Sequence, residues 1–303
     1  MQIAIAGGSG FIGTKLSEYF VKQGHTVYIL TRNAGNKPSK NGITYVEWLN
    51  GQAKPEQVLE GIDAFVNLAG ESIGSGRWTA KRKQRIVQSR IETTRAVIAL
   101  FNALDKKPEV LINASAVGYY GNSERAVFTE ESSPIESDFL SDVVQRWEHE
   151  AARARDFGIR VVYCRLGIVL DKDEGALQRM LLPYQLFAGG TLGSGKQWVS
   201  WIHIRDVIGM IDFALTNPEI DGPFNLTTPT PLQMKEFGKT IAAVLHRPHW
   251  IPAPSFALKA LLGEMSTLVL DGQQVLPEKA EKHGYAYHFP NAKQALEDLL
   301  KSH

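Results

Sequence analysis

The chain opens with Gln2-Ile-Ala-Ile-Ala6 and runs directly into Gly7-Gly-Ser-Gly-Phe-Ile-Gly13. This order predicts a short apolar strand, a glycine-rich turn and then a helix, because Ile12, Leu16 and Phe20 follow at helical spacing. Glycines let the backbone turn tightly and approach a pyrophosphate, whose negative charge is favoured at the helix N-terminus. The segment therefore predicts a dinucleotide site, with a plain flexible glycine turn as the alternative.

The end of the next predicted strand, Thr26–Thr31, indicates which dinucleotide binds. An acidic residue there would accept hydrogen bonds from the adenosine ribose and favour NAD, but this chain has Thr31-Arg32. A guanidinium can pair with a 2′-phosphate in fork geometry, so the sequence favours NADP. The alternative is an arginine that stacks on the adenine or is solvated at the start of a loop.

The composition is that of an ordinary globular protein without charge bias. The chain has 303 residues, a formal net charge of +1 and 44% apolar residues, enough for a large core. Near-neutral charge gives no electrostatic reason to expect a nucleic acid or a membrane surface as a partner. The single cysteine, Cys164, excludes an internal disulfide, and no metal site is expected. Without a leader pattern or a long apolar run, the expected location is the cytoplasm.

Strand and helix patterns alternate through the first half of the chain, which is typical of a parallel sheet with helices on both faces. After the first two strands, the strand candidates are Ile43–Trp48, Ala64–Asn67, Val110–Ala114 and Val161–Leu166. Long helices are predicted from about Thr79 to Leu104 and from Phe139 to Asp156. We therefore predict an α/β protein with a Rossmann-type, doubly wound parallel sheet.

Several segments resemble the extended short-chain dehydrogenase superfamily, the group that contains the nucleotide-sugar epimerases and dehydratases. They are Gly7–Gly13, Asn67-Leu-Ala-Gly70, Ser115-Ala-Val-Gly-Tyr-Tyr-Gly121, Trp201-Ile-His-Ile-Arg-Asp206 and Gly222-Pro-Phe-Asn225. More closely, the chain resembles the "epimerase family protein" branch. The marks of that branch are Asn67-Leu-Ala-Gly-Glu71, Arg77-Trp78, Ser89-Arg90, Trp147-Glu148 and a C-terminal tail with Gly263-Glu-Met265, Pro277 and Gly284-Tyr-x-Tyr-x-Phe289.

The resemblance implies a domain organisation and a set of cofactor contacts. Residues 1–167, with a return segment at about 201–226, are expected to form the NADP-binding domain. Residues 168–200 and 227–303 are expected to form a smaller, interleaved C-terminal substrate lobe. The predicted cofactor-binding residues are Gly7, Ser9, Gly10, Phe11, Ile12, Gly13, Thr31, Arg32, Leu68, Ala69, Glu71 and Arg77.

The usual chemistry of the superfamily uses a tyrosine and a lysine four residues later, whose charge lowers the phenol pKa. The helix expected to carry this pair reads Phe139-Leu-Ser-Asp-Val-Val-Gln-Arg-Trp-Glu148 and contains neither residue. The customary serine falls on Ala116, and Ser115 precedes it on the opposite face of a strand. The remaining catalytic candidates are Tyr119, Tyr120 and Ser115, and for the tyrosines aromatic packing beside the cofactor is the alternative.

Two functions of different class follow from these observations. In the first, the protein is an NADP-dependent oxidoreductase or epimerase that acts on a carbonyl or nucleotide-sugar-like substrate with an unconventional proton donor. In the second, it is a non-catalytic NADP-binding sensor or regulatory protein. Members of the superfamily often pair through the two long helices, so a homodimer is also expected.

Overall fold

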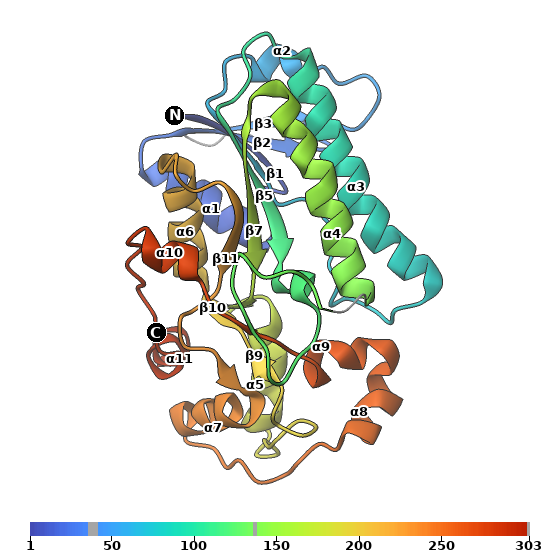
Figure 1. The fold of residues 1–303 in the computed structure, drawn as a ribbon, viewed down its shortest axis with the longest axis vertical. Coiled ribbons are helices and arrows are strands. Elements are labelled where there is room, and N and C mark those ends of the chain that lie inside the picture. Colours follow the sequence, from blue (N-terminus) through green and yellow to red (C-terminus); the bar gives the residue numbers. More distant parts are fainter. Residues whose placement is uncertain (36–41, 136–137, 302–303) are drawn as a thin grey trace.

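A seven-stranded parallel sheet forms the centre of the molecule (Figure 1). The computed structural model describes residues 1–35, 42–135 and 138–301. The strand order is β11-β7-β5-β4-β1-β2-β3, and every neighbouring pair is parallel. The strands are β1 (Gln2–Ala6), β2 (Thr26–Thr31), β3 (Ile43–Glu47), β4 (Ala64–Asn67), β5 (Val110–Ala116), β7 (Arg160–Leu166) and β11 (Gly222–Leu226).

The chain reverses its direction of winding between β1 and β4, which are neighbours in the sheet. In open α/β sheets, ligands bind outside the carboxyl ends of the strands at such a reversal. The glycine-rich turn after β1 and the turn after β4 therefore lie at the expected ligand crevice. The predicted Rossmann-type doubly wound fold is confirmed.

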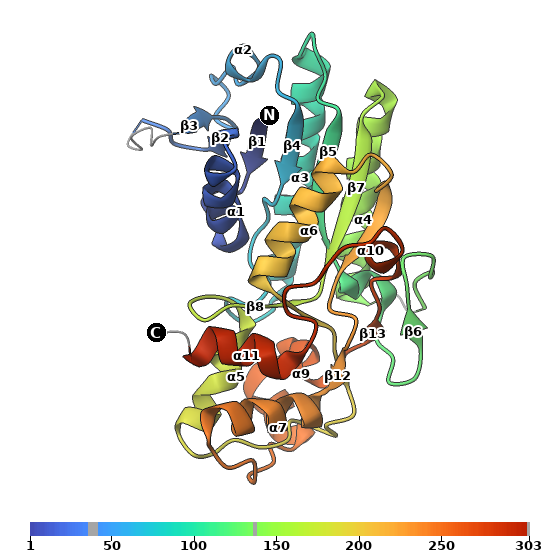
Figure 2. The same cartoon turned by 90° about the vertical axis from the view of Figure 1, so that its left-hand side faces the viewer.

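Helices cover both faces of the sheet (Figure 2). On one face, α1 (Phe11–Lys22) and α6 (Ile204–Thr216) enclose a core with Ile3, Ile5 and Phe224. On the other face, α3 (Ala80–Ala103) and α4 (Phe139–Ala152) enclose a core that contains Phe65 and Phe101. Alternate residues of each strand supply the two cores, as the period of two in a strand requires.

The two long helices begin at capping residues that the sequence supplies. Thr79 accepts a hydrogen bond from the backbone N–H of Arg82 at the start of α3, and Asp138 accepts one from Ser141 at the start of α4. The helix predicted to reach Asp156 ends as an α-helix at Ala152, and a 3-10 turn, η2 (Arg153–Phe157), continues to Gly158. Gly158 has φ +76°, a left-handed conformation that ends the turn.

A second group of elements lies below the carboxyl ends of the sheet in Figures 1 and 2. Its core includes Trp201, Tyr184 and Phe237. The elements of this part are α5 (Ala176–Gln185), α7 (Met234–Leu245), α8 (Ser255–Leu262), η3 (Gly263–Ser266), α9 (Thr267–Leu270) and α11 (Ala292–Lys301). The division into two domains stays a prediction.

The tail returns to the sheet before it ends, a path that the sequence did not predict. Ala280, on α10 (Glu278–Lys282), belongs to the core beneath α1 and α6, and Tyr285 and Tyr287 pack against that core. Asp206 on α6 accepts backbone hydrogen bonds from His288 and Phe289 and so fastens this part of the tail. Residues 278–289 therefore support the sheet, although they were assigned to the smaller lobe.

The remaining elements are short. Six short strands form three separate pairs: β10 (Trp201–His203) with β8 (Ile168–Leu170), β12 (Leu232–Gln233) with β9 (Trp198–Val199), and β13 (Gln274–Val275) with β6 (Val127–Phe128). Two short helical elements complete the description, η1 (Val117–Tyr120) and α2 (Glu56–Leu59). Among the residues that the structure describes, no helix has the length and apolar character that a membrane crossing needs.

Candidate functional site

The glycine-rich turn after β1 is so tight that two of its glycines have no room for a side chain. Gly7 has φ +79°, and a Cβ there would lie 2.8 Å from the carbonyl carbon of Leu68. A Cβ on Gly13 would lie 2.2 Å from the carbonyl oxygen of Gly7. No side chain caps the start of α1 at Gly10, so its first N–H groups are available to an anion.

The loop between β8 and α5 packs over this turn. The Lys15 ammonium on α1 pairs with the buried Asp171 carboxylate at 3.1 Å, and that carboxylate also accepts the backbone N–H groups of Asp173 and Glu174. A Cβ on Gly175 would lie 3.2 Å from the Phe11 ring, so the loop and the turn are in close contact. Ser9 and Gly10 are exposed, whereas Phe11 and Ile12 are half-buried.

The carboxyl end of β2 carries the residues predicted to select the nucleotide. Thr31 is half-buried, and its hydroxyl donates to the carbonyl oxygen of Asn33 at 3.4 Å. Arg32 is exposed, and no hydrogen bond links its guanidinium to another described residue. An arginine in this state is free to pair with an added phosphate.

The loop after β4 is organised by arginines of α3. The Glu71 carboxylate pairs with Arg82, whose guanidinium also donates to the Ser72 carbonyl and the Ser75 hydroxyl. The Arg82 side chain is only 11% exposed, although it lies in a run of charged residues whose pattern is typical of a solvated helix face. Arg77 is exposed and donates to the carbonyl oxygen of Leu261 at the end of α8.

Arg90 lies beside the same loop and was not predicted to take part in the site. Its Nη1 donates to the carbonyl oxygens of Glu71 and Ile86, each at 3.0 Å, and its guanidinium lies 5.0 Å from the centre of the Trp147 ring. Burial lowers the pKa of Arg90 to about 10. The sequence marked Ser89-Arg90 only as part of the branch pattern, since nothing local shows that the guanidinium is buried.

A buried network joins the carboxyl ends of β5 and β7 to α4. The Ser115 hydroxyl donates to Glu148 at 2.5 Å, and Arg165 donates to both Glu148 oxygens at 2.8 Å. Although burial opposes the charged form, the hydrogen bonds and charge of Glu148 raise the pKa of Arg165 above its ordinary value. The ion pair is bidentate and leaves both groups satisfied.

The tyrosines of η1 attach to this network from one end. The Tyr120 hydroxyl donates to the side-chain oxygen of Asn225 at 2.7 Å and accepts from Arg165 at 3.0 Å. Burial raises the pKa of Tyr120 to about 12, and its side chain is fully enclosed. The Tyr119 ring is half-buried and covers the Arg165 guanidinium, with 3.4 Å from Cζ to the ring centre.

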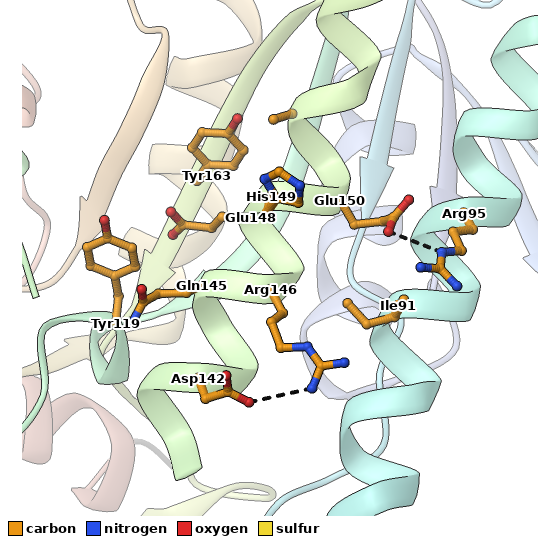
Figure 3. Close-up of a pocket in the computed structure, with 11 residues that line it drawn as sticks. Ile91, Arg95, Tyr119, Asp142, Gln145, Arg146, Glu148, His149, Glu150 and Tyr163 are labelled. Atoms are coloured by element: carbon orange, nitrogen blue, oxygen red, sulfur yellow. Dashed lines mark hydrogen bonds and ion pairs between the residues drawn. The ribbon is translucent and has the colours of Figure 1, made fainter. Parts of the chain in front are cut away.

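The Tyr119 side chain lies beside α4, where the structure has an open cavity of about 640 Å³ (Figure 3). In Figure 3 its hydroxyl is at the end of the ring that points away from η1. No hydrogen bond joins this hydroxyl to another described residue, in contrast to the hydroxyls of Ser115 and Tyr120. The catalytic roles of these three residues stay predictions, and Tyr119 alone has a hydroxyl without an internal partner.

The part of α4 next to η1 carries neither the phenol nor the ammonium of the usual mechanism, and its Ser141 hydroxyl donates to the Tyr119 carbonyl oxygen at 3.0 Å. A Cβ on Gly118 would lie 3.5 Å from the Cβ of Leu140, and Val143 and Val144 are buried. His203, at the start of α6, uses its Nδ1 to cap the helix, and burial lowers its pKa to about 4. Within residues 1–35, 42–135 and 138–301, no group of three potential metal ligands is present.

Comparisons with known proteins agree with the resemblance. The sequence profile of the NAD dependent epimerase/dehydratase family matches residues 3–226, and a profile described as a domain of unknown function (DUF1731) matches residues 253–299. The epimerase family protein YfhF of Bacillus subtilis is 50% identical over 300 residues, which are 99% of this chain and 98% of YfhF.

Solved structures extend the likeness to three dimensions. The human epimerase family protein SDR39U1, crystallised with NADPH, has a TM-score of 0.87 and 32% identity, and all of both chains is covered. A nucleoside-diphosphate sugar epimerase from Corynebacterium glutamicum has a TM-score of 0.78 and 30% identity, covering 99% of this chain and 58% of that protein. A UDP-glucuronic acid 4-epimerase from Bacillus cereus, at 17% identity and a TM-score of 0.78, shares the fold.

Proposed function

The chain belongs to the NAD dependent epimerase/dehydratase family, and we propose that it is an NADP-dependent oxidoreductase of the extended short-chain dehydrogenase type, acting on a carbonyl compound. The observation that carries the cofactor assignment is Arg32. It follows β2 with an exposed guanidinium that has no hydrogen bond or ion pair to another described residue, at the position where an acid would instead bind the ribose of NAD. SDR39U1, which is similar over its whole length, was crystallised with NADPH.

The cofactor would lie along the carboxyl ends of β1, β2 and β4. Gly7, Ser9, Gly10, Phe11, Ile12 and Gly13 would hold the diphosphate through backbone N–H groups, and Thr31 and Arg32 would bind the adenosine end. Leu68, Ala69 and Glu71 follow β4 and would border the nicotinamide half. Arg77 would act from the rim, where it also links the loop to α8.

NADPH held in this crevice would supply the hydride for reduction of a carbonyl group, and the chain would have to deliver a proton to the carbonyl oxygen. The chain offers no tyrosine or lysine on α4 for this proton transfer. Tyr119 is the candidate donor, since Ser115 and Tyr120 commit their hydroxyls to Glu148 and Asn225. The Arg165 guanidinium against the Tyr119 ring would favour the phenolate that forms after transfer.

The altered α4 also favours a second candidate function, a sensor that binds NADP without turnover. The absence of a tyrosine and a lysine on α4 removes the standard proton relay, while the glycine-rich turn has the tight geometry of a cofactor site. Both functions predict tight NADPH binding, and only the first predicts consumption of NADPH when a carbonyl compound is added. Nucleotide sugars belong in the same test, because the similar Corynebacterium protein is called a nucleoside-diphosphate sugar epimerase.

Calorimetry with NADPH and NADH tests the cofactor assignment. Arg32→Ala should weaken NADPH binding about tenfold or more, because it removes a charge-assisted hydrogen bond to the 2′-phosphate that contributes about 1.5–3 kcal/mol. The affinity for NADH, which lacks that phosphate, should stay unchanged. The control is Arg125→Ala, an exposed arginine in the loop before β6. Equal NADPH-to-NADH ratios in the parent chain and in Arg32→Ala would contradict the assignment.

Turnover is tested by the absorbance of NADPH with a panel of carbonyl compounds and nucleotide sugars. An active substrate is then given to Tyr119→Phe, which should slow hydride transfer while the affinity for NADPH stays the same. Tight NADPH binding with no turnover across the panel would support the sensor. An unchanged rate in Tyr119→Phe would remove this tyrosine as proton donor.

A further inference from the structure

Arg90 is a half-buried cation beside the loop after β4, and no ion pair joins it to a carboxylate of a described residue. Both hydrogen bonds that it makes to described residues use Nη1 and end on the carbonyl oxygens of Glu71 and Ile86. Its Nε and Nη2 donate to no described residue. Neither of these two nitrogens is among the fully buried unpaired side-chain atoms, so both stay accessible to a ligand in the crevice. Free donors on a largely desolvated cation suit an anionic partner.

The nearest acid is already committed elsewhere. The Glu71 carboxylate pairs with Arg82 and lies 3.8 Å from Arg85. Burial lowers the pKa of Arg90 to about 10, and the charge of Glu71 only partly opposes this shift. The guanidinium therefore keeps its charge at neutral pH, and the loop after β4 retains an excess of positive charge.

Two contacts fix the position of this guanidinium. It stacks on the Trp147 ring, which is itself held by a hydrogen bond from its Nε1 to the Thr94 hydroxyl at 3.1 Å. On the other side, a Cβ on Gly70 would lie 3.2 Å from Cγ and 3.3 Å from Cζ of Arg90. Glycine at position 70 thus leaves the room that the arginine occupies. A planar donor held on both sides is suited to bidentate recognition of a carboxylate or phosphate.

Arg90 also lies between the cofactor turn and the altered helix. Gly7 packs on the backbone of Leu68, two residues before Gly70, and Trp147 belongs to α4. The guanidinium is therefore close to the part of the crevice where the nicotinamide and the substrate would meet. Arg77 and Arg179 bind carbonyl oxygens of Leu261 and Gly74 at the rim of the same loop and add positive charge on the path to it.

We propose that Arg90 binds an anionic oxygen of the substrate, so that the substrate is a carbonyl compound carrying a carboxylate or a phosphate group. This inference rests on the proposed function and extends it to the class of substrate. The same chemistry could come from the diphosphate of the cofactor. The two sources differ in what the loss of Arg90 does to NADPH binding.

The experiment uses the full chain loaded with NADPH, whose fluorescence reports binding in the crevice. Oxamate, whose amide carbonyl is not reduced by hydride transfer, and inorganic phosphate are titrated as anionic probes, with acetamide as the neutral probe. The variants are Arg90→Gln and Arg90→Lys, and the matched control is Arg95→Gln. Arg95 lies on the same helix, is 63% exposed and pairs with the Glu150 carboxylate of α4 rather than with the loop after β4.

We expect saturable binding of oxamate or phosphate to the parent chain and none of acetamide. Arg90→Gln should weaken that binding about tenfold or more, the effect of losing hydrogen bonds to a charged group, with NADPH affinity changed less than about twofold. Arg90→Lys should keep part of the binding, because the charge remains while the fork is lost. Arg95→Gln should bind like the parent chain.

Other outcomes are also decisive. A large loss of NADPH affinity in Arg90→Gln would assign the guanidinium to the cofactor and overturn the substrate assignment. Parent protein that binds NADPH but neither anion would overturn the inference without any variant, even if Arg90→Gln fails to fold. Parent protein that binds no NADPH would instead contradict the proposed function, so the two failures are distinguishable.

Discussion

The two ends of the sheet crevice are built in opposite ways. Around β1 and α1, the ligand-binding surface is backbone, with Gly7 and Gly13 too crowded for a Cβ and an α1 N-terminus without a side-chain cap. Around β5, β7 and α4, side chains bond to one another, with Glu148 and Arg165 at the centre. Where the backbone itself binds the ligand, only glycine fits at the crowded positions. Where side chains form the site, they can be replaced by others with different chemistry while the fold is kept.

The largest expected effect is at the side-chain end. Arg165→Met leaves the Glu148 carboxylate buried without its ion pair and should lower the free energy of unfolding by about 3–5 kcal/mol. Urea denaturation followed by circular dichroism measures this change. The control is Arg146→Met on α4, the helix that carries Glu148; it removes an exposed pair with Asp142 and should cost less than about 1 kcal/mol. Equal costs for the two variants would show that the buried network is not what stabilises this end.

At the backbone end, Gly13→Ala should abolish cofactor binding before it abolishes the fold. The added Cβ would collide with the Gly7 carbonyl oxygen, so the turn must move and its N–H groups lose alignment. We expect NADPH affinity to fall about 100-fold, since several hydrogen bonds to a charged group, each of about 1.5–3 kcal/mol, weaken together. Fluorescence titration measures the affinity. Gly24→Ala, at φ +81° but with nothing within 4 Å of its Cβ, should cost stability and leave the NADPH affinity unchanged, which separates backbone strain from loss of the site.

A third position, the start of α6, should make the free energy of unfolding fall at acidic pH. His203 is buried, and its folded-state pKa of about 4 lies below the ordinary value of about 6.5. Its contribution to stability is therefore complete above about pH 6.5 and is lost as the pH falls toward 4, with about 1–2 kcal/mol lost by pH 5. The groups that face it are Asp298 at 3.3 Å, Arg205 and Asp171.

The variant His203→Asn isolates this effect, because asparagine keeps an acceptor for the helix cap and does not titrate. Denaturation curves at pH 7 and pH 5 should differ less for the variant than for the parent chain. Burial also raises the pKa of Asp206. Its contribution to the pH dependence of stability is the same in both proteins and therefore cancels in the comparison. An identical pH dependence in the two proteins would exclude His203 as the source.

The smallest expected effect concerns the loop that closes over the backbone end. Lys15→Met removes the ion pair with Asp171, but the carboxylate keeps two backbone hydrogen bonds. We expect a loss of about 1 kcal/mol in stability and a rise of no more than about threefold in the NADPH dissociation constant. Thermal unfolding and fluorescence titration measure the two quantities. A change as large as that of Gly13→Ala would mean that the loop itself holds the cofactor.

Local pattern was sufficient for the fold and for the location of the nucleotide turn. The strands Gln2–Ala6, Thr26–Thr31 and Ala64–Asn67 were predicted with the bounds that the structure has. The sequence also showed that α4 lacks the tyrosine and lysine of the usual mechanism. These features depend on residues that are adjacent in the chain or that recur at a fixed period, so short-range physical rules can find them.

Tertiary structure decided which side chains are free to act. Arg82 and Arg90 lie on one charged helix and cannot be told from solvated cations in sequence, yet the fold buries both against the loop after β4. Ser115 and Tyr120 received partners 33 and 105 residues away, which no local pattern encodes. Desolvation and pairing depend on all the elements that meet at a point, and this is why the anionic site proposed at Arg90 could be inferred only after the chain was folded.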